Sequence, residues 1–480
     1  MMLTSANFQG SAEQNPTLRE ILTSLSFALD LTEGATPGHA IRSSLLAIRI
    51  GLEAGVDAGT LSDGYYACLL KDVGCSSNAS RMCQIVGGDE RMVKAGAKLQ
   101  DWRSPYKPQP AAVKLLWKEV LPNGTVFERG VRLAKIALTQ TKNSAELIGL
   151  RCDRGAQIVR KLGLADGVAL GVRHLDEHWD GGGYPDGLRG AAIPMLSRLM
   201  GIAQHLDAFA GAQGEERAMS TLTARAGRWF DPELARAAEH LHRQGRLWGQ
   251  CGPDAVTDES RRALRDFDPG SDAPLSEWDI DSVCEAYAEV VDAKSPFTFR
   301  HSVRVMEAAT EIGRELGLEP ARLRMLRRAA LLHDVGKLGI SNTILEKTSE
   351  LSADEFKLVK AHPGYGFDIL RGISSFQEIA LLAREHHERL DGSGYPHNLS
   401  GKDLSLESRI LATADTYGAL SETRPYRQAL RPREIVEIME KHQPQRLDRW
   451  SFEALRGLMA NDSWFLNQPV LEGSAACALR

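Results

Sequence analysis

Several short segments of the first half of the sequence recur in the same order in the second half. The run LLKDVG at 69–74 recurs as LLHDVG after 262 residues, and His39 and His301 are separated by the same 262 residues. Further along, EHWDGGGYP at 177–185 recurs as ERLDGSGYP after 211 residues, so the first half carries 51 extra residues between the matches. Constant offsets over several matches indicate two copies of one fold, with a period far too long for a solenoid.

The hydrophobic pattern of both copies is helical. In the second copy, apolar residues recur at the three- and four-residue spacing of amphipathic helices. Ser352 and Glu355 form a capping-box pattern that predicts the start of a helix running toward His362, and further helices are predicted at 378–388 and 406–420. Alternation of apolar and polar residues, which would indicate strands, is scarce. The expected fold class is all-α, with two tandem helical bundles, each carrying a long glycine-rich loop around its Gly-Tyr-Pro.

A polar stretch containing glycine and proline separates the two copies. We expect a first domain at 16–246, a linker at 247–275 and a second domain at 276–461. The extra residues of the first copy form an insertion near 75–145, which would serve as a lid or as an interface. Its prolines predict partly irregular structure, at Pro105, Pro108 and Pro110.

Composition limits the class of protein. With 480 residues, of which 43% are hydrophobic and 25% charged, the chain is long enough for two or three globular domains. The net charge of −5, without a basic stripe, argues against a nucleic-acid binder. No segment approaches the ~20 apolar residues of a membrane span, and the first residues lack the apolar core of a signal peptide. We therefore expect a cytoplasmic protein with neither a nucleic-acid nor a membrane partner.

The second copy gathers side chains that bind transition metals. Five histidines and two aspartates have this character: His301, His333, Asp334, His362, His386, His387 and Asp415. One such histidine alone is more often a packing or capping residue. Seven ligand-type residues in one domain instead favour a metal centre, and imidazole with carboxylate suits iron, manganese or zinc better than magnesium.

Two pairs of these residues are adjacent in sequence, and neighbours on a helix point about 100° apart. Each pair, His333 with Asp334 and His386 with His387, would therefore address two different ions. Two ions ~3.5–4 Å apart favour phosphodiester hydrolysis, because they polarise phosphoryl oxygens and lower the pKa of a bridging water. Lys337 adds a point charge for a phosphate oxygen. These residues suggest a dinuclear phosphohydrolase.

The order of the motifs resembles a known family. Between His301 and the end of the second copy stand the runs LLHDVGK at 331–337, KAHP at 360–363, HHE at 386–388, DGSGYP at 391–396, AD at 414–415 and RPYR at 424–427. Over 276–461 this combination resembles the HD-GYP phosphodiesterases. The resemblance implies a helical bundle of the HD superfamily with a two- or three-metal centre that hydrolyses cyclic di-GMP to linear pGpG or GMP.

The resemblance also implies roles for single residues. The seven ligand-type residues would bind the metal ions, with Asp334 and Lys337 catalytic. Contacts to the substrate are implied for Lys337, Asp391, Gly394, Tyr395, Pro396, Arg409 and Arg424.

Two positions of the second copy depart from the family pattern. Phe297 stands where some three-metal relatives have a glutamate, which favours two ions here. Gly418 stands where the family usually has a second aspartate, which puts local helix order or substrate fit in question. The expected cofactors are two divalent transition-metal ions, with iron or manganese ahead of zinc, nickel or cobalt.

The first copy has lost most of the ligand set. His39 and Asp72 keep two of the seven positions. The other five are occupied by Lys71, Arg151, Leu175, Asp176 and Gln204, and Cys75 stands in place of Lys337. Arginine does not act as a metal ligand and lysine does so only at a steep cost, so we expect no dinuclear centre here. Either these cations pair with Asp72 and Asp176 and hold the bundle together, or they bind a nucleotide phosphate without hydrolysing it.

Four functions remain open at this point. The default is hydrolysis of cyclic di-GMP, and 3′3′-cyclic GMP-AMP is the alternative substrate, since no single residue decides between them. A general nucleotide phosphohydrolase of the HD superfamily is disfavoured by the run GYP at 394–396. A non-catalytic signalling scaffold suits the first copy better than the second. A homodimer is among the open oligomeric states.

Overall fold

The computed structural model describes residues 15–101, 110–249, 273–298, 300–425, 427–443 and 445–460. Throughout these ranges the regular structure is helical, and β-type pairing is limited to isolated bridges. The expected all-α class is therefore confirmed. None of the helices in these ranges is long and apolar enough to cross a membrane.

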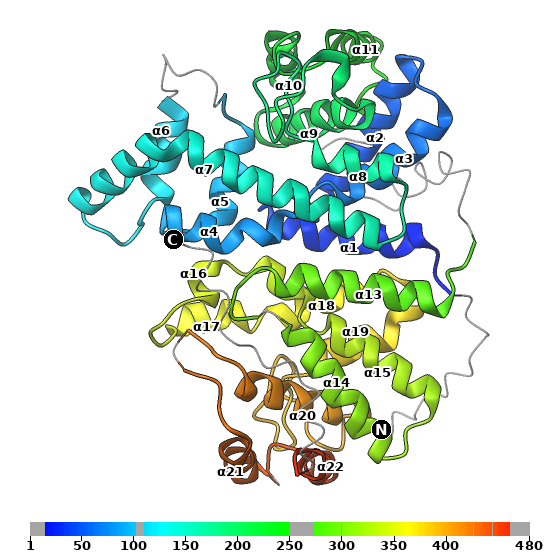
Figure 1. The fold of residues 1–480 in the computed structure, drawn as a ribbon, viewed down its shortest axis with the longest axis vertical. Helices are drawn as coiled ribbons and strands as arrows, with labels where there is room; N and C mark the ends of the chain where they lie inside the picture. The colour runs from blue at the N-terminus through cyan, green and yellow to red at the C-terminus, as the bar shows by residue number, and fades with distance from the viewer. Residues whose placement is uncertain are drawn as a thin grey trace, which may run out of the picture.

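Residues 15–249 form an N-terminal half, drawn in the upper part of Figure 1. Its helices are α1 (Leu18–Thr32), α2 (His39–Glu53), α3 (Ala58–Leu70), η1 (Cys75–Asn78), α4 (Ala79–Val86), α5 (Glu90–Lys98), α6 (Pro110–Glu119), α7 (Val126–Lys161), α8 (Asp166–Arg173), η2 (Gly190–Ala192), α9 (Met195–Gln213), α10 (Glu215–Arg225) and α11 (Pro232–Arg243).

Residues 273–460 form a C-terminal half, drawn in the lower part of Figure 1. Its helices are α13 (Glu277–Asp292), α14 (His301–Glu315), α15 (Pro320–Leu332), η4 (Val335–Gly339), α16 (Asn342–Leu345), α17 (Ala353–Val359), α18 (His362–Leu370), η5 (Ser374–Phe376), α19 (Gln377–Glu385), α20 (Leu406–Ser421), α21 (Pro432–His442) and α22 (Arg449–Met459).

The internal repeat is visible in the helix boundaries. Helices α14 and α15 begin and end 262 residues after α2 and α3, and α19 and α20 begin 211 residues after α8 and α9. The capping box predicted at Ser352 and Glu355 is present and opens α17. A second capping box, between Ser276 and Asp279, opens α13. Local sequence signals thus define helix starts in the half that carries the ligand-type residues.

The insertion of the first copy is largely helical where it is described. It contains α4, α5 and α6 and the first part of α7, which a capping box between Thr125 and Glu128 opens. Val86, Val93 and Val120 form a small apolar core of its own. Pro110 begins α6, whereas Pro105 and Pro108 lie outside the described residues. In Figure 1 the hairpin of α6 and α7 projects from the body of the molecule.

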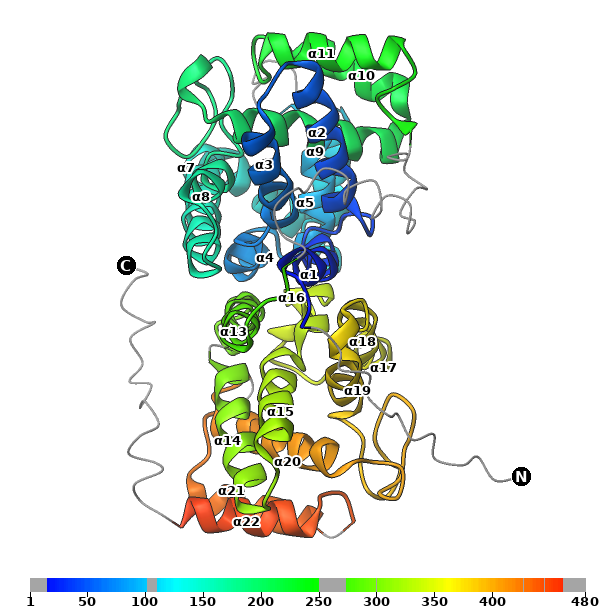
Figure 2. The same cartoon turned by 90° about the vertical axis from the view of Figure 1, so that its right-hand side faces the viewer.

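The two halves share an extensive interface. Helix α1 packs against η4 and α18, and α4 packs against α16 (Figure 2). One cluster of buried apolar residues runs through both halves. At its edge the Ser24 hydroxyl donates to the Ile369 carbonyl, and Arg154 Nη2 lies 2.8 Å from Glu289 Oε2. The first copy therefore packs directly on the elements that carry the ligand-type residues of the second.

Candidate metal centre

The seven ligand-type residues of the second copy converge from five helices. His301 and His362 are the first residues of α14 and α18, and Asp415 lies inside α20. We expected the two adjacent pairs to lie within helices, and this was wrong: His333 and Asp334 follow the end of α15, and His386 and His387 follow the end of α19. His333 and His386 are the C-cap residues of these helices and keep right-handed helical backbone angles.

Asp334 lies between two groups of histidines. Its Oδ2 atom faces His301 Nε2 at 3.5 Å and His333 Nε2 at 3.2 Å. Its Oδ1 atom faces His362 Nε2 at 3.3 Å and His386 Nε2 at 3.7 Å. A single buried carboxylate thus offers one oxygen to each group.

Asp415 connects the same two groups from the other side. Its Oδ1 atom lies 3.3 Å from His301 Nε2 and 3.7 Å from His333 Nε2. Its Oδ2 atom lies 3.5 Å from His387 Nδ1. The ligand atoms of His301, His333 and Asp415 lie within 4.8 Å of one another, and so do those of His362, His386 and His387.

The outward-facing nitrogens of three histidines are held by backbone carbonyls. His333 Nδ1 contacts the Ala330 carbonyl at 2.8 Å, His362 Nδ1 the Val359 carbonyl at 2.6 Å, and His386 Nδ1 the Ala383 carbonyl at 2.6 Å. Because a carbonyl only accepts, each Nδ1 carries a proton, and each Nε2 is the nitrogen directed into the site, where it can bind a cation when it carries no proton. This is the arrangement that metal-binding histidines usually have.

Several atoms inside the site form no hydrogen bond. His301 Nε2, His333 Nε2 and Asp334 Oδ1 are buried, and each lacks a hydrogen-bond partner. Buried polar atoms are almost always paired, so such orphans indicate a missing ligand. Imidazole nitrogens and carboxylate oxygens are the donors that borderline divalent cations prefer. The residues present therefore fit two divalent cations, one in each group.

Charge inside the site is strongly coupled. Burial alone would raise the pKa of Asp334, but His333 and Lys337 beside it hold that pKa well below its usual range. Burial alone would lower the pKa of His333, but Asp334 and Asp415 raise it to about 10. Burial lowers the pKa of His386 and His387 well below the usual value. Asp334 and Asp415 thus stabilise positive charge in the part of the site around His333.

An aromatic surface leads away from the metal centre. The ring of Tyr395 lies 4.7 Å from that of His387, and the ring of Phe356 lies 6.3 Å from that of Tyr395. Lys360 Nζ lies 4.7 Å from the centre of the Phe356 ring and 5.2 Å from that of Tyr395. Phe356 is 44% exposed. Sequence reasoning missed Phe356 and Lys360 as site residues, although Lys360 stands in the quoted motif KAHP.

The loop around Gly394 is fixed by a buried carboxylate. Glu388 accepts hydrogen bonds from the backbone N–H of His397 at 2.7 Å and of Leu399 at 2.9 Å. A β-carbon on Gly394 would lie 2.4 Å from Glu388 Cα, so only glycine fits this close approach. Glu177 holds the corresponding loop of the first copy, accepting from Asp186 N at 2.7 Å and Leu188 N at 3.0 Å. Gly394 and Pro396 thus shape the loop that presents Tyr395.

The other residues implied as substrate contacts lie differently. Arg409 donates to the carbonyls of Gly401 at 2.7 Å and Leu404 at 2.9 Å, so it holds the loop before α20, and its contact to the substrate stays a prediction. Asp391 Oδ1 accepts from Ser393 N at 2.9 Å. Arg424 Nη2 lies 3.3 Å from Glu422 Oε2. Arg424 is connected through this carboxylate to His301, and Glu422 is a residue that sequence reasoning missed.

In the first copy, ion pairs fill the equivalent place. Lys71 binds Asp72, and Arg151 binds Asp176. Two further lysines lie on a buried glutamate: Lys94 Nζ is 3.1 Å from Glu33 Oε1 and Lys98 Nζ is 3.0 Å from Glu33 Oε2. Ammonium and guanidinium groups thus stand where the second copy has imidazoles.

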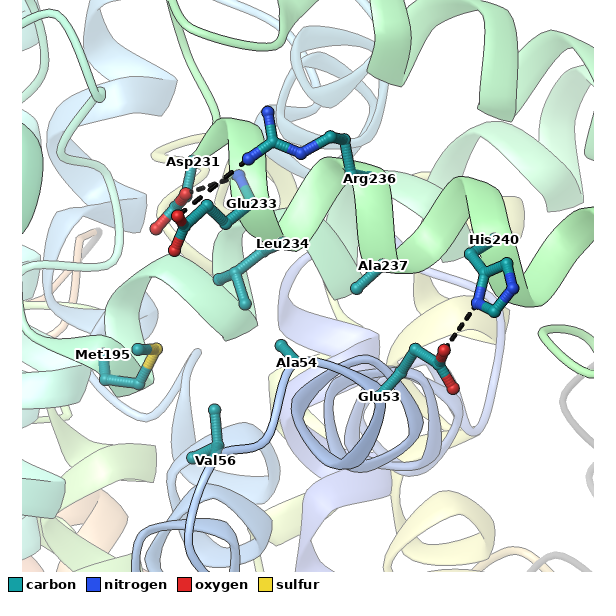
Figure 3. A pocket seen from close by; sticks show the side chains of 10 residues that line it. All are labelled: Glu53, Ala54, Val56, Met195, Asp231, Glu233, Leu234, Arg236, Ala237 and His240. Atoms are coloured by element: carbon teal, nitrogen blue, oxygen red, sulfur yellow. Dashed lines mark hydrogen bonds and ion pairs between the residues drawn. The ribbon is translucent and has the colours of Figure 1, made fainter.

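A surface hollow lies elsewhere on the first copy, between the end of α2 and α11 (Figure 3). Glu53 Oε1 and His240 Nδ1 pair across it at 2.5 Å. None of the ligand-type residues lines this hollow.

The chain is similar to known proteins over nearly its whole length. A profile of the HD domain matches residues 132–234 and 285–450. The 3′3′-cGAMP-specific phosphodiesterase 3 of Vibrio cholerae serotype O1 is 37% identical over 439 residues, which cover 92% of this chain and 94% of that protein. The cyclic di-GMP phosphodiesterase response regulator RpfG of Xanthomonas campestris is 39% identical over 144 residues, which cover 30% of this chain and 38% of that protein.

A solved structure agrees with these relatives. The crystal structure of a cyclic GMP-AMP specific phosphodiesterase of V. cholerae, V-cGAP3, superposes with a TM-score of 0.62 at 33% identity, covering 95% of this chain and 99% of that one. The clustered histidines and aspartates and the matched profile point to the same conclusion. This chain belongs to the HD domain family and is an HD-GYP phosphodiesterase.

Proposed function

We propose that the chain hydrolyses 3′3′-cyclic GMP-AMP at a dinuclear metal centre in its second half. The observation that carries this proposal is the position of Asp334, whose two carboxylate oxygens face different groups of histidines. His301, His333 and Asp415 would hold one divalent cation, and His362, His386 and His387 the other, with Asp334 shared between them.

The protein groups around this centre have separate tasks. Two divalent cations, when bound, would polarise the scissile phosphate and lower the pKa of a bound water. Asp334 and Asp415 orient the two histidine groups toward each other. Lys337 Nζ lies beside the Asp334 carboxylate, where it is placed to neutralise a phosphate oxygen. Mixed imidazole and carboxylate ligands favour iron or manganese, ahead of zinc, nickel or cobalt.

The aromatic surface formed by Tyr395, Phe356 and Lys360 is suited to a purine base. Stacking of a base on an aromatic ring is worth ~1–3 kcal/mol and needs no particular base identity. Both candidate substrates contain two purine nucleosides, and two phosphodiesters join their riboses into a ring. One base on this surface would place the adjacent phosphate toward His387, since Tyr395 contacts that ring.

The choice of substrate rests on the relatives. A relative that matches 92% of this chain is named as specific for 3′3′-cGAMP. The cyclic di-GMP phosphodiesterase of X. campestris matches only 30% of this chain. We therefore place 3′3′-cyclic GMP-AMP ahead of cyclic di-GMP, which was our default from the sequence alone.

We also propose a division of labour between two domains. Residues 276–461 would carry the metal centre and all turnover, and residues 16–246 would support it without binding metal. The ion pairs of Lys71 with Asp72 and of Arg151 with Asp176 support this, because they satisfy charges that metal ions would otherwise balance.

Two measurements on the purified full-length protein test the proposal. Metal analysis should give two equivalents of transition metal per chain. Chromatography of digests should show faster cleavage of 3′3′-cyclic GMP-AMP than of cyclic di-GMP at equal concentration, with linear dinucleotide or mononucleotide products. Faster cleavage of cyclic di-GMP would reverse the substrate assignment, and cleavage of neither by metal-loaded protein would reject the proposed function.

A further inference from the structure

One of the positions at which the two copies differ lies next to His301 of the metal centre. The first copy has Asp207 on α9, and the residue 211 positions later is Gly418 on α20. Asp207 Oδ2 lies 2.6 Å from His39 Nδ1, and its Oδ1 atom accepts from Arg42 Nε, also at 2.6 Å. Gly418 has no side chain to play this part, although His301 still stands in the place of His39.

A different carboxylate reaches the same two partners in the second copy. Glu422 lies just beyond the end of α20, four residues after Gly418. Its Oε2 atom lies 3.0 Å from His301 Nδ1, and its Oε1 atom lies 3.3 Å from Arg304 Nη1. His301 and Arg304 correspond to His39 and Arg42 at the offset of 262 residues. Glu422 is only 5% exposed, so the contact is made away from water.

Packing explains why the carboxylate comes from a new place. A β-carbon on Gly418 would lie 2.8 Å from Val305 Cγ2 and 3.3 Å from His301 Cε1. The first-copy residue that corresponds to Val305 is the smaller Ser43, which is fully buried. A side chain at 418 would therefore require Val305 to shift, whereas the smaller Ser43 stands at the matching position of the copy that carries Asp207.

We propose that Glu422 is the positioning residue for His301, taking over the task of the aspartate that position 418 lacks. By accepting from Nδ1–H it fixes the tautomer that leaves Nε2 free to bind a cation. Arg304 and Arg424 hold the Glu422 carboxylate in turn, at 3.3 Å each. This inference rests on the proposed metal-ligand role of His301.

Competition with a chelator measures the effect on metal affinity. E422M keeps the side-chain volume but removes the acceptor, and it should bind metal ~10–100-fold more weakly than the wild type, as losses of such partners typically do. E422Q keeps one acceptor oxygen and should lie between them. Turnover of E422M at saturating substrate should fall while KM changes little, because Glu422 contacts a metal ligand. D207N is the matched control in the first copy and should leave metal affinity unchanged.

Transfer of the first-copy arrangement provides the rescue. Adding V305S and G418D to E422M should return metal affinity to within a few-fold of the wild type. Wild-type affinity in E422M would overturn the inference, and so would a triple variant that keeps the wild-type melting temperature but binds metal as weakly as E422M. Absence of metal binding in the wild-type protein would instead reject the metal centre itself, so the two failures are distinguishable.

Discussion

Lys337 Nζ lies 2.5 Å from Asp334 Oδ2, the carboxylate oxygen that also faces His301 and His333. The lysine is partly exposed, whereas the aspartate is almost completely buried. Asp334 is therefore enclosed with the ligand-type residues, whereas the side chain of Lys337 is partly accessible to solvent. Substitutions of Asp334 and of Lys337 should therefore have different effects on metal binding.

Asp334→Ala should abolish turnover and metal binding while the helical fold persists. The reason is that the Asp334 carboxylate faces both His362 and His333. Metal analysis, circular dichroism and substrate digests give the three readouts. The full-length variant Asp72→Ala, changed at the matching position of the first copy, should still turn over the substrate. Retention by Asp334→Ala of more than a few percent of the wild-type rate at saturating metal would contradict the dinuclear assignment.

Lys337→Ala should slow hydrolysis without removing metal. Loss of one group that stabilises charge in the transition state typically costs about 10- to 1000-fold in rate. Single-turnover rates and metal content measured on the same preparation test this, with the exposed Lys402→Ala as control. A Lys337→Ala protein that purifies without metal would show that the lysine belongs to the support of the centre.

The repeat and the ligand set could be predicted from sequence because they depend on residue identity and order. Constant offsets identify the two copies, and the residue types and order of His301, His333 and Asp415 predict the cluster that the structure brings together. Capping signals such as Ser352 and Glu355 act within one turn, so they too were readable.

Contacts that depend on packing could not be predicted. Glu422 follows a helix end, and its approach to His301 depends on how α20 crosses α14. Gly418 marks the missing aspartate in the sequence, but no local pattern indicates that Glu422, one helical turn later, supplies a carboxylate in its place. Arg409 was assigned from motif position alone, and the structure uses its donors on backbone carbonyls of its own loop.

Metal binding to metal-free protein should release protons at neutral pH. Burial lowers the pKa of His333, but Asp334 and Asp415 outweigh burial and raise it to about 10, so this histidine is protonated at pH 7.5. A ligand nitrogen must be neutral, so the proton has to leave and affinity should rise about tenfold per pH unit for each proton released. Calorimetry in two buffers of different ionisation enthalpy counts the protons. Zero release at pH 7.5 would contradict this charge state.

Neutralising both cations of the first copy should lower stability. Lys71→Met with Arg151→Met removes the cation that contacts Asp72 and the one that contacts Asp176. Asp72 is buried and keeps only the more distant Lys98, at 3.8 Å, and loss of the nearer partner of a buried carboxylate is costly. The melting temperature of the full-length protein should fall, whereas the exposed Lys118→Met should leave it nearly unchanged. A double variant that keeps its melting temperature but loses nucleotide binding would favour a sensor role for the first copy.

The last prediction concerns a buried contact between the two halves. Glu90 of α5 is fully buried and accepts from Ser341 Oγ at 2.8 Å and from Asn342 N at 3.2 Å. Lys294 Nζ lies 3.6 Å from Glu90 Oε1 and donates to the Leu338 carbonyl at 2.9 Å. Leu338 belongs to η4, the turn that follows Asp334 and contains Lys337. The insertion of the first copy thus reaches this turn through the Glu90–Lys294 ion pair, and Arg91 of the same helix donates to the Gly339 carbonyl of the turn.

Glu90→Ala should therefore destabilise the protein and slow turnover together. Burial lowers the pKa of Lys294 to about 8, so at pH 7 the lysine is still mostly charged and would lose its buried partner. Breaking a buried pair in this way typically costs ~3–5 kcal/mol. Glu90→Ala combined with Lys294→Met should recover part of the loss in urea melts, because no buried charge is then left unpaired. The penalty of Glu90→Ala should also shrink above pH 8, where Lys294 gives up its proton. If Glu90→Ala melts like the wild type at pH 7, this contact does not couple the two halves.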